Sequence, residues 1–444
     1  MALSIGQKAG WGLADLGIVV FVIVKQLLIV NYLTNFLGVP VGIAGLVTTV
    51  VLIFDMVTDP LIGYLSDRTT SRFGRRAPWL FVGVVIMALG MVGLFMAPLE
   101  AAMPVKLIWV IAAFVLATIG FTMCAIPYSA LAGELTADPR ERSTMTGWRM
   151  GFATVGILVG GAVLPGLAGA FGFPLAALYV SPLMIGAIWL SLWSIRKVPL
   201  IESPVQPGFT AAYKLVFTNR SFVVLALIYG IMTLAVALIT AGLPFAATYL
   251  VVDDGQNALS GAAVALSVLS VLFGAFFVGA ILSQVFWVLL SHRLGKMWAL
   301  VLGLLAYVAL LYALHIVLPA TSVTVVAGLF IIAGATNGAY QQIPWAMYPD
   351  LMDKTRAQTG AAIEGAFSAI WLFGQKLANA LAPALLGVIL ARAGWQETTA
   401  GVTPQTEQAL SALHQAITLV PAGILALSVL ALLLIYRPMV RRDA

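Results

Sequence analysis

Residues 50–63 read VVLIFDMVTDPLIG and place two aspartates, Asp55 and Asp59, inside an otherwise apolar segment. A carboxylate at bilayer depth costs about 3 kcal/mol, so it is rarely found there without a partner or a task. The four-residue spacing puts both carboxylates on one helix face, about one turn apart, with the Thr58 hydroxyl beside them. These hard oxygen ligands suit a small cation or a proton, so the stretch predicts a membrane helix that carries a coupling-ion site. The alternative is that the two aspartates only form salt bridges with neighbouring helices.

The composition of the whole chain agrees with a membrane location. Of its 444 residues, 61% are hydrophobic and 9% are charged, whereas charged residues make up about a quarter of a soluble domain. Apolar stretches longer than about 18 residues recur, and each is long enough to cross a bilayer as a helix. The sequence therefore predicts an all-α polytopic membrane protein whose surroundings are the lipid bilayer. The single cysteine, Cys124, excludes an intrachain disulfide and a cysteine metal cluster.

Hydropathy and the polar breaks predict twelve membrane spans. Their expected ranges are 11–35, 41–66, 79–98, 105–133, 144–170, 174–195, 221–250, 262–290, 298–318, 322–347, 361–391 and 409–436.

The cationic residues predict the topology. Nearly all lysines and arginines outside the spans lie in loops after even-numbered spans or at the two termini, and the other side has only Lys106 and Arg392. This asymmetry predicts that both termini are cytoplasmic, and it supports an even number of spans. The net charge of +6 is therefore a topology signal, and we expect neither a nucleic-acid partner nor an obligate protein partner.

The chain divides into two predicted halves. The longest polar break, residues 196–220, contains three prolines and predicts a cytoplasmic linker between a half at 1–195 and a half at 221–444. The two halves are similar in sequence at one loop. The loop from Gly63 to Arg76 in the first half corresponds to a shorter, less well matched segment at 290–296 in the second half. Repeated halves with a site between them are typical of an alternating-access transporter.

The loop at 63–76 resembles the cytoplasmic signature of the major facilitator superfamily, through GYLSDR followed by RFGRR. The resemblance implies a major facilitator fold of 12 transmembrane helices in two six-helix halves. Asp67 can cap a helix or pair with a loop arginine and so latch one state; the alternative is a basic cluster that only sets topology. The predicted cytoplasmic gate comprises Asp67, Arg68, Arg75, Arg142, Asp350, Asp353, Arg356 and Glu364.

A narrower resemblance rests on motifs spread over essentially the whole chain. WGLADLG at 11–17, the Asp55/Asp59-Pro60 group and TMCAIPY at 122–128 are similar to the glycoside–pentoside–hexuronide:cation symporters, the group typified by the melibiose permease. The residues Arg149, Asp350-Leu351-Met352-Asp353 and Lys376 also match that group. The resemblance implies a sugar–cation symporter of a bacterial inner membrane.

For the cation, the resemblance implies that Asp55 and Asp59 bind the coupling ion and that Thr122 contributes. Thr58 stands where the family more often has an asparagine, so a site for Na⁺ and a site for H⁺ both remain open. Lys376 lies in the middle of the eleventh predicted span, where a lone ammonium is costly. Its natural partners are the two aspartates across the halves, where it would act in coupling; the alternative is a permanent structural salt bridge.

For the solute, the residues depart from the melibiose permease. Val19 and Ala125 match the positions where that permease has sugar-binding acids, and neither side chain accepts a hydrogen bond. Arg149 is retained, and Lys25 is added with Gln26 beside it. The expected cavity is therefore more positive and favours a carboxylate-bearing solute such as a uronide. The alternative for Lys25 is snorkelling or pairing with a neighbouring helix.

Other residues leave their roles open. Asp15 is expected either to pair with Arg149 or to cap a helix. The aromatic side chains of Tyr128, Trp148, Trp345 and Trp371 can stack on a sugar ring, although aromatics in membrane helices more often pack or anchor at the interface.

The sequence contains none of the motifs that would indicate an enzyme. It has no phosphate-binding GxxxxGK[ST] loop, no HExxH and no GxSxG, and the three histidines are too scattered along the chain for a zinc site. We therefore expect no cofactor and no enzymatic activity. The predicted function is symport of a small solute with Na⁺ or H⁺. The alternatives are a lysolipid or other amphipath carrier, another organic-anion carrier and a membrane sensor that does not transport.

Overall fold

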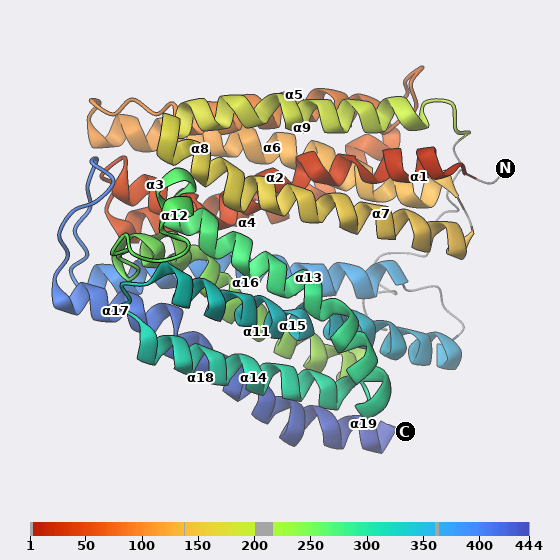
Figure 1. Cartoon of the computed structure of the whole chain (residues 1–444). Coiled ribbons are helices and arrows are strands. Elements are labelled where there is room, and N and C mark those ends of the chain that lie inside the picture. The colour runs from red at the N-terminus through yellow and green to blue at the C-terminus, as the bar shows by residue number, and fades with distance from the viewer. Residues whose placement is uncertain (1–2, 137, 200–215, 360–363, 444) are drawn as a thin grey trace.

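The structure is a computed structural model that describes residues 3–136, 138–199, 216–359 and 364–443. The helices form two groups that lie side by side (Figure 1). The first group contains α1 (Ile5–Gly12), α2 (Ala14–Leu27), α3 (Ile29–Asn35), α4 (Val41–Arg68), α5 (Ala77–Phe95), α6 (Met103–Leu135), α7 (Pro139–Leu158), the π-helical turn η1 (Val159–Val163), α8 (Leu164–Phe171) and α9 (Phe173–Ile195).

The second group is built in the same manner from the later part of the chain. It contains α11 (Arg220–Tyr249), α12 (Ser260–Leu266), α13 (Val268–Leu294), α14 (Lys296–Val317), α15 (Val323–Thr359), α16 (Glu364–Arg392), α17 (Glu407–Ile417), α18 (Leu419–Ala431), the π-helical turn η2 (Leu432–Tyr436) and α19 (Arg437–Asp443). The predicted linker at 196–220 falls mostly on residues outside the described ranges, so the domain boundaries stay a prediction.

The all-α fold predicted from the sequence is confirmed. In the described residues, twelve helices are long and apolar enough to cross a membrane. Their ranges are 5–27, 41–66, 77–95, 103–132, 144–171, 173–195, 220–249, 268–294, 296–317, 323–352, 367–392 and 407–441. Most ends agree with the predicted spans to within a few residues.

Six ends differ by five residues or more, and two of them have a clear local cause. The first span begins at Ile5 because Ser4 caps it: the Ser4 hydroxyl accepts from the Gln7 amide, and the Gln7 side chain accepts from the Ser4 amide. The eighth span begins at Val268 because Ser267 has a φ of 81°, which separates the short helix α12 from α13.

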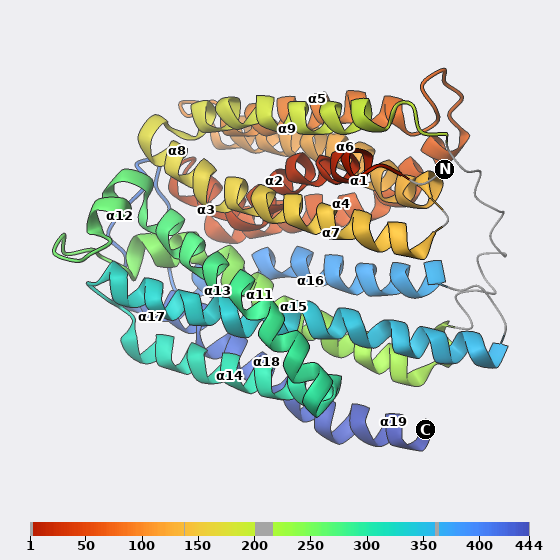
Figure 2. The same ribbon diagram turned by 45° about the vertical axis from the view of Figure 1, so that its right-hand side comes forward.

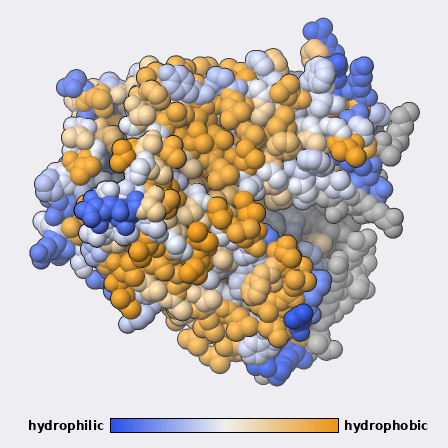
Figure 3. All heavy atoms as spheres, in the orientation of Figure 1, coloured by the Kyte–Doolittle hydropathy of each residue, from blue (hydrophilic) through white to orange (hydrophobic). Residues whose placement is uncertain are grey.

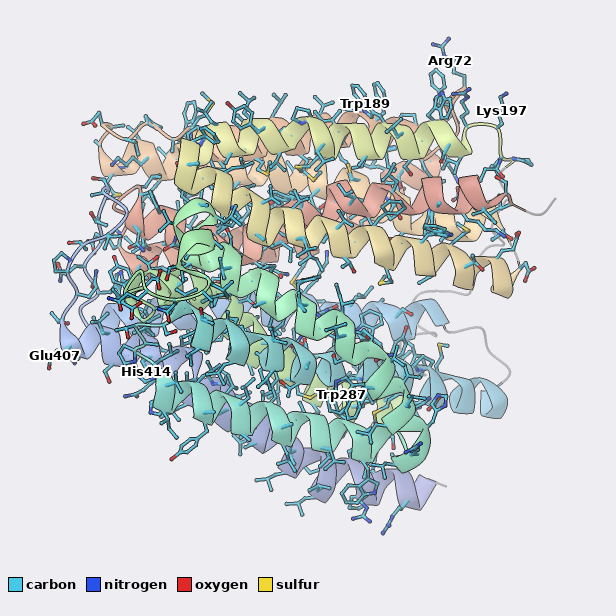
Figure 4. All side chains as sticks on the ribbon, in the orientation of Figure 1. Arg72, Trp189, Lys197, Trp287, Glu407 and His414 are labelled. Carbon is cyan, nitrogen blue, oxygen red and sulfur yellow. The ribbon has the colours of Figure 1, made fainter. Side chains whose placement is uncertain are left out.

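The distribution of side chains fits a membrane protein. Apolar residues cover broad areas of the middle of the bundle, and hydrophilic residues gather toward its two ends (Figure 3). Arg72 and Lys197 lie at the end that also carries both chain termini, and Glu407 and His414 lie at the opposite end (Figure 4). We call these the terminal end and the distal end.

Within each group, glycines bring neighbouring helices into backbone contact. A Cβ at Gly120 of α6 would lie 2.7 Å from the Met87 Cα of α5, and one at Gly334 of α15 would lie 2.7 Å from the Ala280 nitrogen of α13. Lipid tails are as apolar as leucine, so membrane helices associate through such close packing.

The α13–α15 contact gives a stability prediction. Gly334→Ala is expected to lower the free energy of unfolding by about 1–3 kcal/mol, because its Cβ would press on the Phe276 carbonyl oxygen and force the helices apart. Gly328→Ala on the same helix is the matched control, since a Cβ there has open space. Unfolding of the purified variants in one detergent measures the difference, and equal losses in both variants would contradict this packing role.

The two groups meet along α4 and α16, which Figure 2 shows running beside each other. The Thr49 hydroxyl donates to the Ala380 carbonyl at 2.6 Å and accepts from the Ala384 amide at 3.2 Å. A Cβ at Gly387 would lie 2.8 Å from the Val41 carbonyl oxygen. These contacts hold the distal halves of α4 and α16 together.

Further contacts join the groups at the distal end. The Ser270 hydroxyl of α13 donates to the Ala162 carbonyl in η1 at 2.7 Å, and the Gly401 amide donates to the Asn35 carbonyl of α3 at 2.7 Å. Toward the terminal end the surface is hollowed between the groups (Figure 3). Among the described residues, the groups are therefore joined at the distal end, and the surface between them is hollowed toward the terminal end.

Candidate cation and solute site

The two aspartates of α4 lie where four helices approach one another. Asp55 is 3% exposed, and both of its oxygens are occupied. Its Oδ1 accepts from the Thr122 hydroxyl of α6 at 2.8 Å, and its Oδ2 accepts from the Lys25 ammonium of α2 at 3.0 Å. One buried carboxylate thus ties three helices of the first group together.

The second group contributes Lys376 from α16. Its ammonium forms an ion pair with Asp59 Oδ2 and lies 3.6 Å from Asp55 Oδ2. The second oxygen of Asp59, Oδ1, is buried and has no hydrogen-bond partner in the described part of the chain. Lys376 is therefore an ionic link between the two helix groups, and among the described residues the Asp59 Oδ1 beside it has no hydrogen-bond partner.

Thr58 lies on the same helix, half-buried, but its hydroxyl is turned to its own backbone. The Thr58 Oγ1 donates toward the carbonyls of Phe54 and Asp55, each at 3.1 Å. The structure thus brings Asp55, Asp59, Thr122 and Lys376 into direct contact and leaves Thr58 at the edge of the set.

Lys25, predicted as a solute-binding residue, lies at the cation site. Its side chain is 6% exposed and its ammonium sits over the Phe121 ring, 3.8 Å from the centroid, as well as on Asp55. This corresponds to the pairing alternative that the sequence left open. Gln26 follows it on α2 and is partly buried.

Arg149 occupies a second ionic site in the first group. Its Nε donates to Asp15 Oδ2 at 2.6 Å, and its guanidinium lies 5.1 Å from the Tyr128 ring centre. Tyr128 in turn stacks on Trp11 at 4.8 Å. Asp15 therefore pairs with Arg149. The Arg149 side chain keeps 30% of its surface exposed, so it can still meet a solute.

The predicted tryptophans fall in two other places. Trp371 is buried and stacks on Tyr229 at 4.2 Å, and Trp345, 38% exposed, donates its Nε1 to the Tyr229 hydroxyl at 2.9 Å. These rings form an aromatic cluster in the second group. Trp148 is 41% exposed on α7 and stacks only loosely on Phe152, at 6.3 Å. The predicted solute residues thus do not form one continuous patch in this state.

Charge is balanced across the two ionic sites. Asp55 and Asp59 face Lys25 and Lys376, and Asp15 faces Arg149. The expected surplus of positive charge is therefore absent among these described groups, because each cation already has a carboxylate partner.

At the terminal end, a glutamate that the sequence analysis did not single out organises the predicted gate. Glu134, at the end of α6, accepts from Arg75 at 2.8 Å and from Arg76 at 3.1 Å through the same oxygen. Arg76 also donates to Ser66 of α4 at 2.7 Å. The sequence offers only a weak signal for this contact, because charged residues are common where an apolar span ends.

Other gate predictions have mixed outcomes. Arg68 lies over the Tyr64 ring at 4.1 Å, and Asp350 pairs with Lys296 at 2.6 Å. The side chains of the remaining five predicted gate residues lie outside the described residues: Asp67, Arg142, Asp353, Arg356 and Glu364.

Glu141 forms a further terminal-end contact. It accepts from the Thr136 hydroxyl at 2.7 Å and from the Leu3 amide at 2.9 Å, and it pairs with Lys8. Hydrogen bonds from Thr136 and Lys8 lower the pKa of Glu141 below its usual value.

Two histidines of the second group lie side by side. The structure brings His315 and His414 together, with ring centres 4.2 Å apart, although they are far apart in sequence. Within the described residues, no group of three or more His, Cys, Asp or Glu side chains could hold a metal ion.

The fold and the buried ionic cluster together define the class of the protein as a membrane transporter of the major facilitator type. More particularly, the chain belongs to the family described as MFS/sugar transport protein, whose model matches residues 10–440. The family resemblance predicted from the motifs is thereby confirmed.

Similar proteins agree with this assignment. The chain is 26% identical to "Inner membrane symporter YicJ" of Escherichia coli, over 95% of this chain and 89% of that protein. It is 26% identical to "Putative sulfoquinovose importer" of Salmonella typhimurium, over 98% and 90%. The crystal structure of the nucleoside transporter NupG superposes with a TM-score of 0.65 at 14% identity, covering 97% of this chain and 98% of that one.

Proposed function

We propose that the protein is a secondary active symporter that moves a small solute with Na⁺ or H⁺ by alternating access. The observation that carries this proposal is the ion pair between Lys376 of the second helix group and the Asp55/Asp59 pair of the first. Charged side chains inside a membrane are energetically costly, so they indicate a function. Here they form the ion pair between the two helix groups, which must rearrange when the groups move relative to each other in alternating access.

Coupling follows from competition at this contact. A cation that binds Asp59 weakens its hold on Lys376, so cation binding changes the energy of the link between the groups. A solute bound between the groups responds to the same rearrangement. The two ligands then favour one another, and by linkage each raises the affinity for the other.

The proposed solute is a sugar, a glycoside or a uronide, including anionic ones. Arg149 supports this choice, because its exposed guanidinium can donate to hydroxyl or carboxylate oxygens. The aromatic cluster around Trp345 offers a stacking face. The relative named for sulfoquinovose supports a sugar solute.

We further propose an inner-membrane location with both termini in the cytoplasm. The positive-inside pattern of the loops supports this orientation, and the relative named as an inner membrane symporter supports the location. The described state would then be open toward the cytoplasm.

Uptake by the purified protein in liposomes tests the proposal. A panel of a neutral glycoside, a uronide and a sulfonated sugar is offered under an inward Na⁺ gradient, an inward H⁺ gradient or no gradient. We expect at least one of these solutes to accumulate against its own gradient only when an ion gradient is present. Equilibration without accumulation for every solute that enters would contradict symport.

An amphipath carrier is the second candidate, and one observation favours it. An apolar pocket in the second group is lined by side chains that include Leu243, Phe273, Phe276, Leu311 and Phe330. Such a pocket can hold an acyl chain. A lysolipid in the same liposome assay separates the two candidates, because only the amphipath carrier moves it between leaflets.

A further inference from the structure

Lys25 is held at the cation site by two contacts and by burial. Its ammonium donates to Asp55 Oδ2 at 3.0 Å, lies over the Phe121 ring at 3.8 Å and is nearly excluded from solvent. Hydrogen bond, cation–π contact and burial together fix the charge in one place.

The charges in the cluster already cancel. Asp55 and Asp59 are the two anions, and Lys25 and Lys376 are the two cations in contact with them. Without Lys25 the same cluster would carry one net negative charge, which one monovalent metal ion would neutralise. With Lys25, a metal ion would leave a net positive charge away from water, which is unfavourable.

The oxygen atoms around the cluster also disfavour a bound metal ion. A small hard cation needs several oxygen ligands that point toward it. Both oxygens of Asp55 are taken, Oδ1 by Thr122 and Oδ2 by Lys25, and the Thr58 hydroxyl is turned to its own backbone. Asp59 Oδ1 is the one carboxylate oxygen of the described cluster that has no partner. The residues present therefore do not fit a sodium ion while Lys25 is bound.

We propose that Lys25 is a tethered substitute for the metal cation at Asp55, and that transport by this protein does not use sodium. The ammonium neutralises Asp55 as a bound metal would, but it is part of α2 and cannot be released with the solute. This inference rests on the proposed function and narrows it, since of the two coupling ions considered only the proton remains.

Sodium-dependent thermal unfolding tests the substitution without any solute. The purified protein is unfolded in sodium chloride and in choline chloride at equal ionic strength. Wild type is expected to have the same Tm in both salts. Lys25→Met, which keeps the stem of the side chain and removes its charge, is expected to gain a sodium-specific rise of about 2 °C or more, because an ion that binds only the folded state stabilises it.

Two variants serve as matched controls. Lys25→Arg keeps a cation beside Asp55 and is expected to show no sodium response. Lys25→Met combined with Asp55→Asn removes the anion that the metal would bind, and is expected to lose the response gained by the single variant. If Lys25→Met does not fold, Lys25→Gln takes its place with the same expectation.

Two results of the unfolding experiment would overturn the inference. One is a sodium-specific rise in the Tm of wild type that is lost in Asp55→Asn. The other is a folded Lys25→Met or Lys25→Gln variant that does not respond to sodium. Sodium-driven uptake by wild type would also overturn it while leaving symport intact. Absence of any coupled uptake would contradict the proposed function, and the unfolding experiment would still decide the role of Lys25.

Discussion

Asp59→Asn is expected to abolish uphill uptake while the protein still inserts and folds. Asparagine has nearly the same shape as aspartate, so packing around α4 is preserved, but the carboxylate that holds Lys376 and would take the coupling ion is gone. Lys376 keeps Asp55 as a partner at 3.6 Å, which limits the loss of stability. Accumulation of solute in liposomes under an imposed ion gradient measures the effect.

Glu407→Gln is the control for this prediction. Glu407 is an exposed carboxylate in the first turn of α17 at the distal end, and it belongs neither to the cation site nor to the predicted gate. Exposed substitutions of this kind change stability little, so this variant is expected to accumulate solute as wild type does. Uphill uptake that survives in Asp59→Asn would remove Asp59 from the coupling mechanism.

The sequence predicts the fold well because a bilayer imposes a simple rule. Every spanning helix needs about 20 apolar residues and must satisfy its own backbone, so the spans stand out in hydropathy. Where two observed ends of spans differ from the predicted ones, the cause is a local backbone feature that hydropathy does not report. The Ser4 cap adds a turn before the first predicted span, and the positive φ of Ser267 shortens the eighth.

The candidate site is only partly visible in sequence. Asp55, Asp59 and Lys376 stand out because charges inside apolar spans are rare. The pairing of Lys25 with Asp55 cannot be read from the sequence, because α2 and α4 are brought together only by tertiary packing. Glu134 lies where an apolar span ends, a place in which a charge is unremarkable, so its contact with Arg75 gives little signal.

The ion pairs in the structure also change what the cationic residues imply about the charge of the solute. Counting Arg149 and Lys25 along the chain predicts a positive cavity, but the structure gives each one a carboxylate partner. Selectivity for an anionic solute would therefore depend on how easily Asp15 gives up Arg149, and that dependence can be measured.

Asp15→Asn is expected to raise the affinity for an anionic sugar by about tenfold, which is about 1.4 kcal/mol, and to leave a neutral glycoside nearly unchanged. In wild type, Asp15 Oδ2 holds the Arg149 Nε at 2.6 Å and cancels its charge. Asparagine removes the competing anion and leaves the guanidinium fork free to bind a carboxylate or sulfonate in two-point fashion. Calorimetric titration of the purified variant with a uronide and with its neutral glycoside measures both affinities.

Arg149→Gln is the counterpart, expected to weaken binding of the anionic sugar by about 10- to 100-fold, because a hydrogen bond to a charged group contributes about 1.5–3 kcal/mol. Arg149→Lys keeps the positive charge but cannot donate two parallel hydrogen bonds to one anion. Its affinity for the anionic sugar is therefore expected to lie between those of wild type and Arg149→Gln. If Asp15→Asn instead weakens both sugars equally, the pair serves only to pack α2 against α7, and recognition of the solute must be sought elsewhere. A gain for the anion alone would identify Asp15 as the group that competes with the solute for Arg149.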